Sequence, residues 1–418
     1  MFRSAIKVQV MLMLVDRVLC ALDGSTKGET HAVLASFIDW SKAFDRQDPT
    51  LAVLSFQKNG VRPCLIPLLM SFFEKRTMMV KWHNVMSSTK DLPGGGPQGT
   101  SLGIWSYLSQ TNDNPEGADQ KDIFKFVDDK TTLEVINLLN IGMASHNFKA
   151  SIPNNILTSN LKIPSDNLKT QEYMDRIEEW TEAKKMKVNE KKTQNLIFNF
   201  SKNYQFSTDV KLKGVEIQTV DQIKLLGTTI TSDLRWNENT KLIVKDSNKR
   251  MQFLHRAAKF TNNISDLKEI YMLQVRSKLE QSAVVWHSSL TRRNVNDLER
   301  VQKSALRLIL KDRYINYKDA LKVMKLDTLE ERREKLCLKF AKACVRHEKL
   351  SDMFPKQRKG HQMDMRHTDK FVTTNAKTER LQRSAILNMQ RLLNTDESGK
   401  RKMMRQLNLT VPVNYDCS

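Results

Sequence analysis

The sequence has few cysteines, and none of them are spaced as a metal site or a disulfide framework would need. Its five cysteines are dispersed along 418 residues and form no CxxC pair. The pattern excludes a zinc ribbon, a zinc knuckle and a fold stapled by disulfides, and it fits a reduced, intracellular compartment. Cys337 and Cys344 are seven residues apart and are expected on one face of a helix, packed in the core.

Long apolar runs are also missing. The most apolar N-terminal stretch, residues 8–15, is too short to cross a membrane, and the charged residues Asp16 and Arg17 follow it directly. It also lacks a clear cleavage site of small residues, so the stretch is predicted to belong to a buried helix rather than to a signal peptide. No segment is expected to span a membrane.

Charge, in contrast, is abundant and unevenly distributed. The chain has 68 Lys and Arg against 47 Asp and Glu, a net charge of +21. Residues 1–200 contain 24 basic and 22 acidic residues, whereas residues 201–418 contain 44 and 25, so the C-terminal half carries a net +19. This asymmetry indicates a polyanionic partner, with nucleic acid as the first choice and an anionic membrane surface as the second.

Hydrophobic periodicity and turn residues predict a mixture of helices and strands in the first half and helices in the second. Helices are expected at residues 5–22, 50–58, 63–73 and 171–185, and from residue 242 onward. Strands are expected at residues 32–39, 78–82 and 193–200, with hairpins between residues 215 and 230. Residues 141–168 are expected to form a polar loop, and the chain beyond residue 356 is expected to be loosely attached.

Three segments carry residues suited to chemistry. In FIDWSKAFD, residues 37–45, an apolar strand pattern ends at Asp39; LPGGGPQGTSLG, residues 92–103, is too rich in Gly and Pro to be regular throughout. In FVDD, residues 126–129, two carboxylates end another apolar run. Alone, such a pair is more typical of a solvated turn than of a site. Both carboxylates can serve one site only if the backbone turns at or beside them.

Together and in this order, the three segments resemble the palm of reverse transcriptases, most closely those of non-LTR, LINE-type (Jockey-like) retrotransposons. The resemblance implies an α+β fold, in which a right-hand polymerase palm, with an antiparallel sheet and flanking helices, is followed by an all-helical thumb. It also implies an RNA-directed DNA polymerase that uses an RNA template, a DNA primer and deoxynucleoside triphosphates. A group II intron or telomerase type is the alternative subfamily.

The resemblance assigns roles to the carboxylates. Asp39 and Asp128 correspond to the residues that bind two Mg²⁺ ions, and Asp129 corresponds to an auxiliary carboxylate. Paired magnesium ions assist the attacking primer 3′-hydroxyl and the leaving pyrophosphate, and they need oxygen ligands that converge from different segments. A hairpin turn at FVDD is therefore expected.

Other residues match the family's motifs individually. Phe44 corresponds to an aromatic residue that contacts the sugar, although without the motif it would be assigned to the core. Gln98 and Gly99 correspond to residues that pack against the template and the incoming nucleotide. Lys192 matches the lysine of the next motif and is a candidate catalytic residue, and residues 225–236 resemble the primer-grip hairpin.

The C-terminal half fits a thumb. Between residues 296 and 311, Leu298, Val301, Ala305 and Leu308 recur at helical spacing and are expected in the core. A basic stripe lies on another face of the same helix and is expected along the nucleic-acid backbone; it comprises Arg300, Lys303, Arg307 and Lys311.

The expected domains are a remnant of the fingers at residues 1–30, the palm at 31–240, the thumb at 241–350 and a basic tail at 351–418. The resemblance begins late in the family's pattern, without most of the fingers or an N-terminal endonuclease, so a truncated copy is expected. Two functions stay open: a polymerase fragment, or an inactive palm and thumb that binds nucleic acid. No protein partner can be deduced.

Overall fold

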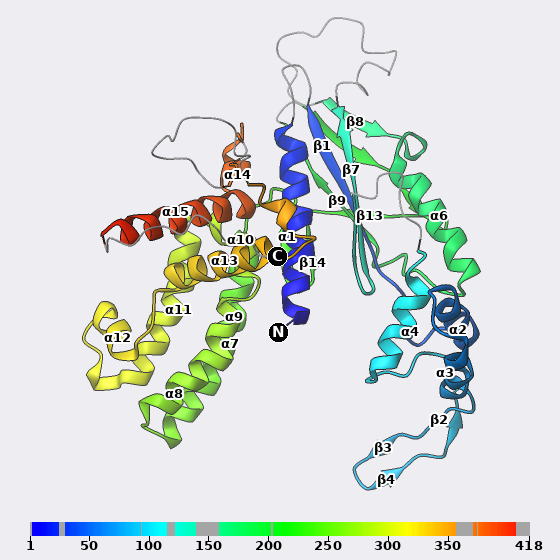
Figure 1. Ribbon diagram of the computed structural model, residues 1–418, viewed down its shortest axis with the longest axis horizontal. Coiled ribbons are helices and arrows are strands. Elements are labelled where there is room, and N and C mark those ends of the chain that lie inside the picture. Colours follow the sequence, from blue (N-terminus) through cyan, green and yellow to red (C-terminus); the bar gives the residue numbers. More distant parts are fainter. Residues whose placement is uncertain are drawn as a thin grey trace, which may run out of the picture. The chain divides into compact units, whose positions relative to one another are not determined.

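The protein has a mixed α and β structure with a central sheet and many helices (Figure 1). The computed structural model describes residues 2–24, 30–92, 94–114, 122–138, 159–201, 204–356, 371–373 and 375–406. The chain forms two compact units. The sheet unit is Ser25–Asp221, and the helical unit combines Met1–Gly24 with Gln222–Ser418.

A five-stranded sheet forms the centre of the sheet unit, in the order β13-β9-β1-β7-β6. Its strands are β1 (His31–Ile38), β6 (Ile123–Phe126), β7 (Asp129–Asn137), β9 (Gln194–Phe198) and β13 (Gln218–Val220). Neighbouring strands are antiparallel except for β13 and β9, which run parallel. The prediction of an antiparallel sheet is wrong at this edge, because the chain between β9 and β13 is long enough for a crossover.

The core of the sheet unit lies between β1 and helix α6 (Lys169–Ala183). Leu34 and Ile38 of β1 belong to the same buried cluster as Met174 and Ile177 of α6. The strand residues differ by an even number and the helix residues by three, so each pair shares one face of its element. The predicted strand at residues 32–39 and helix at 171–185 are thereby confirmed to within two residues.

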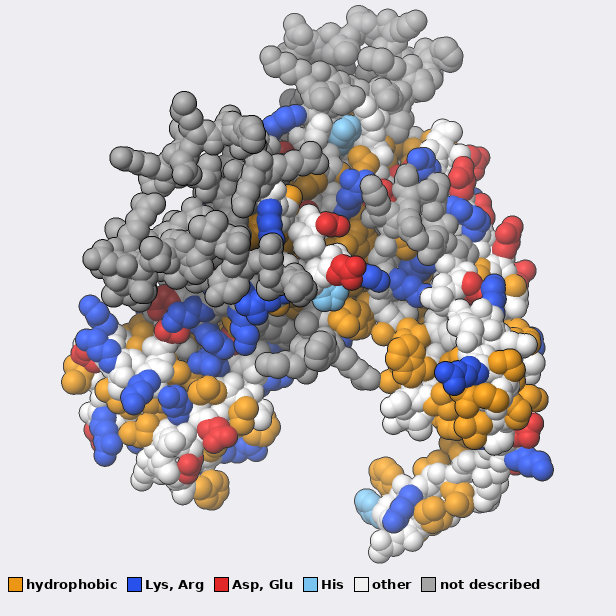
Figure 2. Space-filling view, in the orientation of Figure 1, with side chains coloured by type: hydrophobic (Ala, Val, Ile, Leu, Met, Phe, Trp, Pro, Cys, Tyr) orange, Lys and Arg blue, Asp and Glu red, His pale blue; other side chains and the backbone are white. Residues whose placement is uncertain are grey.

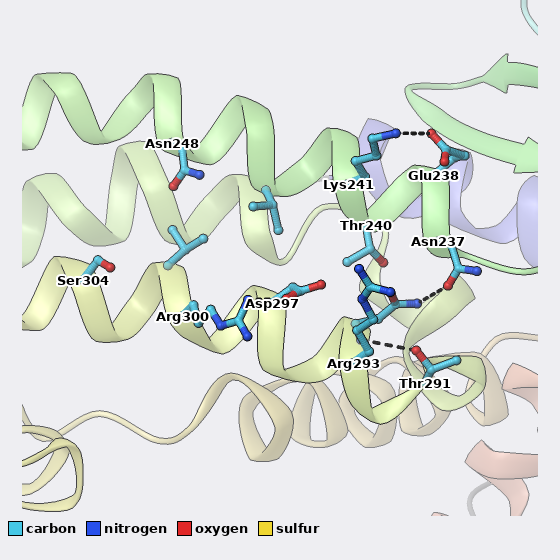
Figure 3. A pocket seen from close by; sticks show the side chains of 13 residues that line it. Asn237, Glu238, Thr240, Lys241, Asn248, Thr291, Arg293, Asp297, Arg300 and Ser304 are labelled. Carbon is cyan, nitrogen blue, oxygen red and sulfur yellow. Dashed lines mark hydrogen bonds and ion pairs between the residues drawn. The ribbon is translucent and has the colours of Figure 1, made fainter.

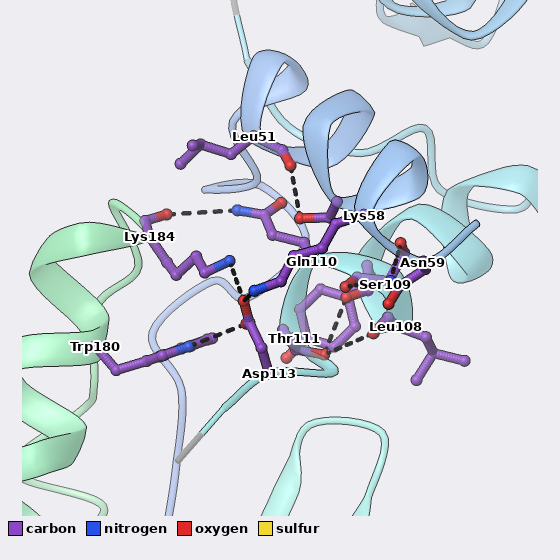
Figure 4. Close-up of polar contacts among 12 residues, drawn as sticks. Leu51, Lys58, Asn59, Leu108, Ser109, Gln110, Thr111, Asp113, Trp180 and Lys184 are labelled. Atoms are coloured by element: carbon purple, nitrogen blue, oxygen red, sulfur yellow. Dashed lines mark hydrogen bonds and ion pairs between the residues drawn. The ribbon is translucent and has the colours of Figure 1, made fainter. Parts of the chain in front are cut away.

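Helices α2 (Pro49–Lys58), α4 (Ser101–Thr111) and α6 are connected through a polar network around Asp113 (Figure 4). Asp113 accepts hydrogen bonds from Lys184 Nζ at 2.7 Å and Trp180 Nε1 at 3.2 Å, and Lys58 Nζ lies 3.5 Å away. Burial would raise the pKa of Asp113, but the hydrogen bonds from Lys184 and Trp180 outweigh burial and lower that pKa. The network helps to fix α4, which directly follows the Gly-rich segment.

A narrow β-ribbon occupies the region where one strand was predicted at residues 78–82. β2 (Thr77–Met78) pairs with β5 (Lys90–Asp91), and β3 (Lys81–Trp82) pairs with β4 (Val85–Met86). The predicted strand is wrong in its bounds, because regular pairing stops between β2 and β3. Beside the ribbon, residues 63–73 form the predicted helix as a short turn followed by α3 (Ile66–Phe73).

The polar loop predicted at residues 141–168 is wrong at its C-terminal end. β8 (Ser159–Ile163) pairs in parallel with β10 (Tyr204–Thr208), and the Ile163 side chain is fully buried. The short apolar pattern of β8 is hidden in the sequence by neighbouring Asn, Ser and Pro residues. Residues 141–158 of the predicted loop lie outside the described residues.

The helical unit begins with α1 (Phe2–Asp23), which was predicted at residues 5–22. Leu12 of α1 shares a buried cluster with Ala341 of α13 (Leu329–Val345), and Asp23 accepts a backbone hydrogen bond from Thr378 at 2.6 Å. The N-terminal segment is therefore part of the helical unit rather than a separate piece. The boundary between the units also lies at residues 221–222 rather than 240, because the hairpin that follows belongs to the helical unit.

That hairpin pairs β14 (Gln222–Leu225) with β15 (Thr228–Thr231). Leu226 and Gly227 form its turn with φ of +49° and +89°, the left-handed pair that a tight hairpin requires. Helices then continue as predicted; they include α7 (Asn237–Phe260), α8 (Ile264–Ile270), α9 (Ser277–Leu279), α10 (Ala283–Trp286), α11 (Arg292–Leu310) and α12 (Tyr317–Met324). Among the described residues, none of the helices combines the length and the apolar character needed to cross a membrane.

The C-terminal region is folded where a loosely attached tail was predicted. α14 (Glu379–Gln382) and α15 (Ala385–Gln406) follow one another, and Ile386, Met389 and Leu393 of α15 join a buried cluster with Cys337 and Cys344. Spacings of three and four residues place the α15 side chains on one helix face. The tail prediction is therefore wrong for α14 and α15, while the predicted burial of both cysteines is confirmed.

Met389→Ala should destabilise the helical unit by about 2–5 kcal/mol, because Met389 is fully buried and truncation leaves a cavity. Urea denaturation followed by circular dichroism measures the change. Lys339→Ala, on the exposed face of α13, is the matched control and should change stability by less than about 0.5 kcal/mol. Equal stabilities for Met389→Ala and the wild type would mean that α15 does not contribute to this core.

A buried arginine in the helical unit depends on a neutral histidine. Arg333 is fully buried, and its Nε donates a hydrogen bond to Nδ1 of His287 at 3.2 Å. Nδ1 can accept this bond only while it carries no proton. Burial and the Arg333 charge lower the pKa of His287 from 6.5 to about 4.

This arrangement predicts acid destabilisation of the helical unit. In the unfolded chain His287 binds a proton near pH 6.5, whereas in the folded protein it does so only near pH 4, so stability falls as the pH falls between these values. The full effect is roughly 3 kcal/mol. His287→Gln should flatten the dependence of urea stability on pH, and the exposed His347→Gln should leave it unchanged. An unchanged slope in His287→Gln would contradict the assignment.

Candidate active site

The carboxylate of Asp39 lies immediately beyond the C-terminal end of β1. Its backbone is anchored on both sides: the Asp39 N–H donates to Thr193 Oγ1 at 3.3 Å, and its carbonyl accepts from the Asn189 N–H at 2.8 Å. Buried side chains hold β1 in place up to Ile38, so the backbone of the next residue, Asp39, is held in a fixed position at the end of the strand. The side chain itself is half-buried.

The FVDD segment forms the turn between β6 and β7, as predicted. Phe126 pairs with Asp129, which leaves Val127 and Asp128 as the two turn residues. Val127 has a φ of +56°, which is unfavourable for a β-branched side chain and indicates local strain that its surroundings must maintain. Val127 also packs against the main core of the sheet unit, which helps to maintain this conformation.

The register of β1 and β7 places the segments that carry these carboxylates at one end of the sheet. Ile38, the last residue of β1, is opposite Lys130, which is the second residue of β7. Asp39 therefore follows β1 at the same end of the sheet as the Asp128–Asp129 turn that precedes β7. In the part of the chain that the structure describes, the Asp39 and Asp128 carboxylates have no hydrogen bond or ion pair, and Asp128 is exposed.

The Gly-rich segment lies against the loop that follows Asp39. The Gly96 N–H donates to the Phe44 carbonyl at 2.7 Å, and the Gly95 N–H donates to the Gln47 carbonyl at 2.8 Å. Gln98 Nε2 donates to Asp45 Oδ1 at 2.8 Å. The structure therefore brings Gln98 close to the Asp39 loop, and Asp45 is a positioning partner that sequence reasoning did not single out.

Two aromatic rings connect this loop with the Asp pair. The Phe44 and Tyr107 rings have centroids 4.4 Å apart and planes inclined by 30°. Burial raises the pKa of Tyr107, and the charges of Asp128 and Asp129 raise it further, so Tyr107 lies within electrostatic reach of both carboxylates. Sequence reasoning assigned no role to Tyr107; its only signal was its place in the helix that follows the Gly-rich segment.

Gly99 and Lys192 occupy exposed turns of the same unit. Gly99 has a φ of +82°, which an L side chain rarely adopts, and a Cβ there would meet no atom within 4 Å. A glycine is thus favoured at position 99 by the backbone conformation and not by a steric clash that a larger side chain would cause. The Lys192 N–H donates to the Asn189 carbonyl at 3.1 Å, so Lys192 lies in the turn that also anchors Asp39.

Three residues of the predicted basic stripe, Arg300, Lys303 and Arg307, lie on α11 in the helical unit, whereas Lys311 is the residue just after the helix, with a φ of +47°, so the helix prediction is wrong at this residue. All four side chains have partners within the unit. Arg300 pairs with Asp297 at 2.9 Å, and Lys311 Nζ donates to Asn262 Oδ1 at 2.7 Å. Lys303 and Arg307 lie over the rings of Tyr317 and Tyr314, at 5.0 and 5.3 Å. The opposite face is buried as predicted at Leu298, Val301 and Ala305, but Leu308 is only half-buried because it lies at the edge of the apolar stripe.

A polar groove of about 870 Å³ runs between α7 and α11 (Figure 3). Arg300 of the basic stripe lines it together with Lys241 and Arg293, while Glu238 and Asp297 supply negative charge. Asn237 Oδ1 accepts a hydrogen bond from Asn294 Nδ2 at 2.9 Å at one end of the groove. The groove therefore combines cations and amides that suit a polar ligand.

The chain is similar in sequence to RNA-directed DNA polymerases of mobile elements. One is the probable RNA-directed DNA polymerase from transposon BS of Drosophila melanogaster, 24% identical over 319 residues, which are 76% of this chain and 33% of that protein. Another is the RNA-directed DNA polymerase from mobile element jockey of the same organism, 27% identical over 207 residues, 49% of this chain and 20% of that one.

These similarities relate the chain to the reverse transcriptases of non-LTR retrotransposons and confirm the predicted resemblance. The chain spans about a third of the length of the first relative and about a fifth of the second. No protein-family model matches it. A Candida albicans telomerase structure, solved with a fragment of telomeric RNA, aligns with 84% of this chain and 53% of that one at 14% identity. The TM-score of 0.25 is too low to indicate a common fold.

Gly96→Ala should disrupt the packing of the Gly-rich segment against the Asp39 loop. A Cβ at Gly96 would lie 2.1 Å from Gln47 Oε1, and Gln47 is buried and accepts a hydrogen bond from Ser106. We expect destabilisation of about 1–3 kcal/mol in thermal or urea unfolding. Gly94→Ala is the matched control, because its nearest contact would be 3.8 Å, and similar losses in both variants would refute the argument.

Proposed function

We propose that this chain is an RNA-directed DNA polymerase module in which the sheet unit is the palm and the helical unit is the thumb. The observation that carries the proposal is the register of β1 and β7, which brings Asp39 and the Asp128–Asp129 turn to one end of the sheet. The reaction would join a deoxynucleoside triphosphate to a primer 3′-hydroxyl opposite an RNA template. Similarity to two RNA-directed DNA polymerases supports the same reaction class.

The residues present are suited to magnesium if the substrate completes its coordination. Among the described residues, no group of three or more His, Cys, Asp and Glu could hold a metal by itself. Magnesium commonly takes only one or two protein carboxylates together with substrate phosphates and water. Asp39 and Asp128 would be those two carboxylates, since both lack a partner in the described part of the chain. Bound Mg²⁺ would supply activation of the 3′-hydroxyl and stabilisation of the leaving pyrophosphate.

The remaining site residues would position the nucleotide and the template. Gln98, held by Asp45, would pack against the base pair being formed, and the glycine backbone at Gly99 would allow close approach. Phe44, supported by Tyr107, would contact the sugar of the incoming nucleotide. Asp129 would be an auxiliary carboxylate.

Lys192, exposed in the turn beside Asp39, would lie close to the triphosphate as a catalytic residue. In the helical unit, the basic stripe of α11 and Lys311 would lie along the phosphates of the primer–template duplex. Such contacts with phosphates position a nucleic acid without reading its sequence. The net charge of +19 on residues 201–418 supports this part of the proposal.

Asp39→Asn and Asp128→Asn should each reduce primer extension on an RNA template by about 10³-fold or more, because each removes one of the two anionic ligands. The assay measures incorporation of deoxynucleotides in the presence of Mg²⁺. Asp221→Asn is the control: it removes an exposed carboxylate next to β13, beyond the Val220–Leu196 pair, and should keep full activity.

Equal extension by Asp128→Asn and the wild type would overturn the assignment of the site. If the wild type extends no primer but binds duplex with a steep dependence on salt, the protein is a nucleic-acid binder without polymerase activity.

A further inference from the structure

The β-ribbon of residues 77–91 exposes an unusual amount of apolar surface. Trp82 is 74% exposed and Val85, its partner across the ribbon, is 70% exposed. The other large exposed apolar residues of the ribbon are Met78, Met79, Val80 and Met86. Within the described strands, β2 pairs only with β5 and β3 only with β4, so the ribbon extends no sheet.

A two-stranded ribbon without a core is marginally stable, and a contiguous exposed apolar patch usually marks a site of interaction. Figure 2 shows hydrophobic side chains gathered on this ribbon and on the neighbouring surface of α2 and α3. The chemistry of the patch indicates which partner would cover it.

The tip of the ribbon is a flat aromatic platform. The rings of Trp82 and His83 are stacked, with centroids 5.2 Å apart and planes inclined by only 10°. His83 has a φ of +51° in the two-residue turn, which places its imidazole beside the indole. Parallel aromatic rings that remain open to solvent are suited to stacking with an unpaired nucleic-acid base.

The charge of the ribbon is complementary to a phosphate backbone. The ribbon itself contains two basic residues, Lys81 and Lys90, and one acidic residue, Asp91, and it is preceded by Glu74, Lys75 and Arg76. Arg76 is engaged with the Gly95 carbonyl at 2.5 Å, whereas Lys81 and Lys90 lie within the ribbon strands and are exposed. An apolar protein partner would account for the methionines but not for the two exposed lysines or for the stacked rings at the tip.

We propose that the ribbon binds single-stranded nucleic acid. An unpaired base stacks on the Trp82–His83 platform, and Lys81 and Lys90 neutralise neighbouring phosphates. A duplex covers both faces of its bases, so the site selects unpaired strands. The site deepens the function proposed above and rests on it for the identity of the strand as a template, but its binding chemistry requires neither Mg²⁺ nor nucleotide.

Binding of a fluorescently labelled single-stranded RNA of about 12 nucleotides, within the usual range for such sites, tests the proposal by anisotropy without Mg²⁺ or nucleotides. In the full chain, Trp82→Ala should weaken binding by about 5- to 100-fold, and Trp82→Phe should retain most of the affinity because it keeps an aromatic ring. Leu68→Ala, which changes another exposed apolar residue, on α3, should bind like the wild type. Lys81→Ala should reduce the slope of log K against log salt by about 0.7.

Unchanged single-strand affinity in Trp82→Ala would overturn the proposal. An equal loss for a blunt duplex would also overturn it, because stacking on an open base would then not be the cause. If sedimentation shows that Trp82→Ala dissolves a dimer without affecting RNA affinity, the ribbon is instead an interface between copies. If wild-type binding depends on Trp82 but no primer is extended, only the polymerase proposal fails.

Discussion

The antiparallel register of β1 and β7 is the constraint on which the candidate active site depends. Ile38 is opposite Lys130, and this one alignment sets the level of Asp39 relative to the Asp128–Asp129 turn. A slip by one residue would turn every side chain of the strand to the other face of the sheet. The buried apolar residues of β1 prevent such a slip, so core packing and the placement of the carboxylates depend on the same alignment.

Polar contacts add to the apolar core in fixing the parts around this pair of strands. Backbone hydrogen bonds join the Gly-rich segment to the loop after Asp39, and the Gln98–Asp45 bond extends that contact to side chains. The Asp113 network helps to hold α4, and with it Tyr107, against the rest of the sheet unit. Strain at Val127 is consistent with a turn that its surroundings hold in an unfavourable conformation.

The helical unit follows a different plan. Its basic side chains form a stripe on α11 and at Lys311, but each is tied to a carboxylate, an amide or a tyrosine ring within the unit. Those contacts limit the freedom of long cationic side chains, so less conformational entropy would be lost if the stripe bound phosphates as proposed. The basic stripe and the similarity to RNA-directed DNA polymerases both fit the nucleic-acid binding proposed for this unit.

The sequence by itself determined the features that depend on neighbouring residues. Periodicity and turn residues predicted β1, α6 and the helix at residues 50–58, and the order of three motifs predicted the relationship to reverse transcriptases. Only the tertiary structure decided which distant residues meet: Phe44 with Tyr107, Asp45 with Gln98, β13 with β9, and α15 with α13. Periodicity is a property of neighbouring residues. Pairings between distant segments depend instead on the entropy of closing the loop between them and on which apolar surfaces are still exposed to water.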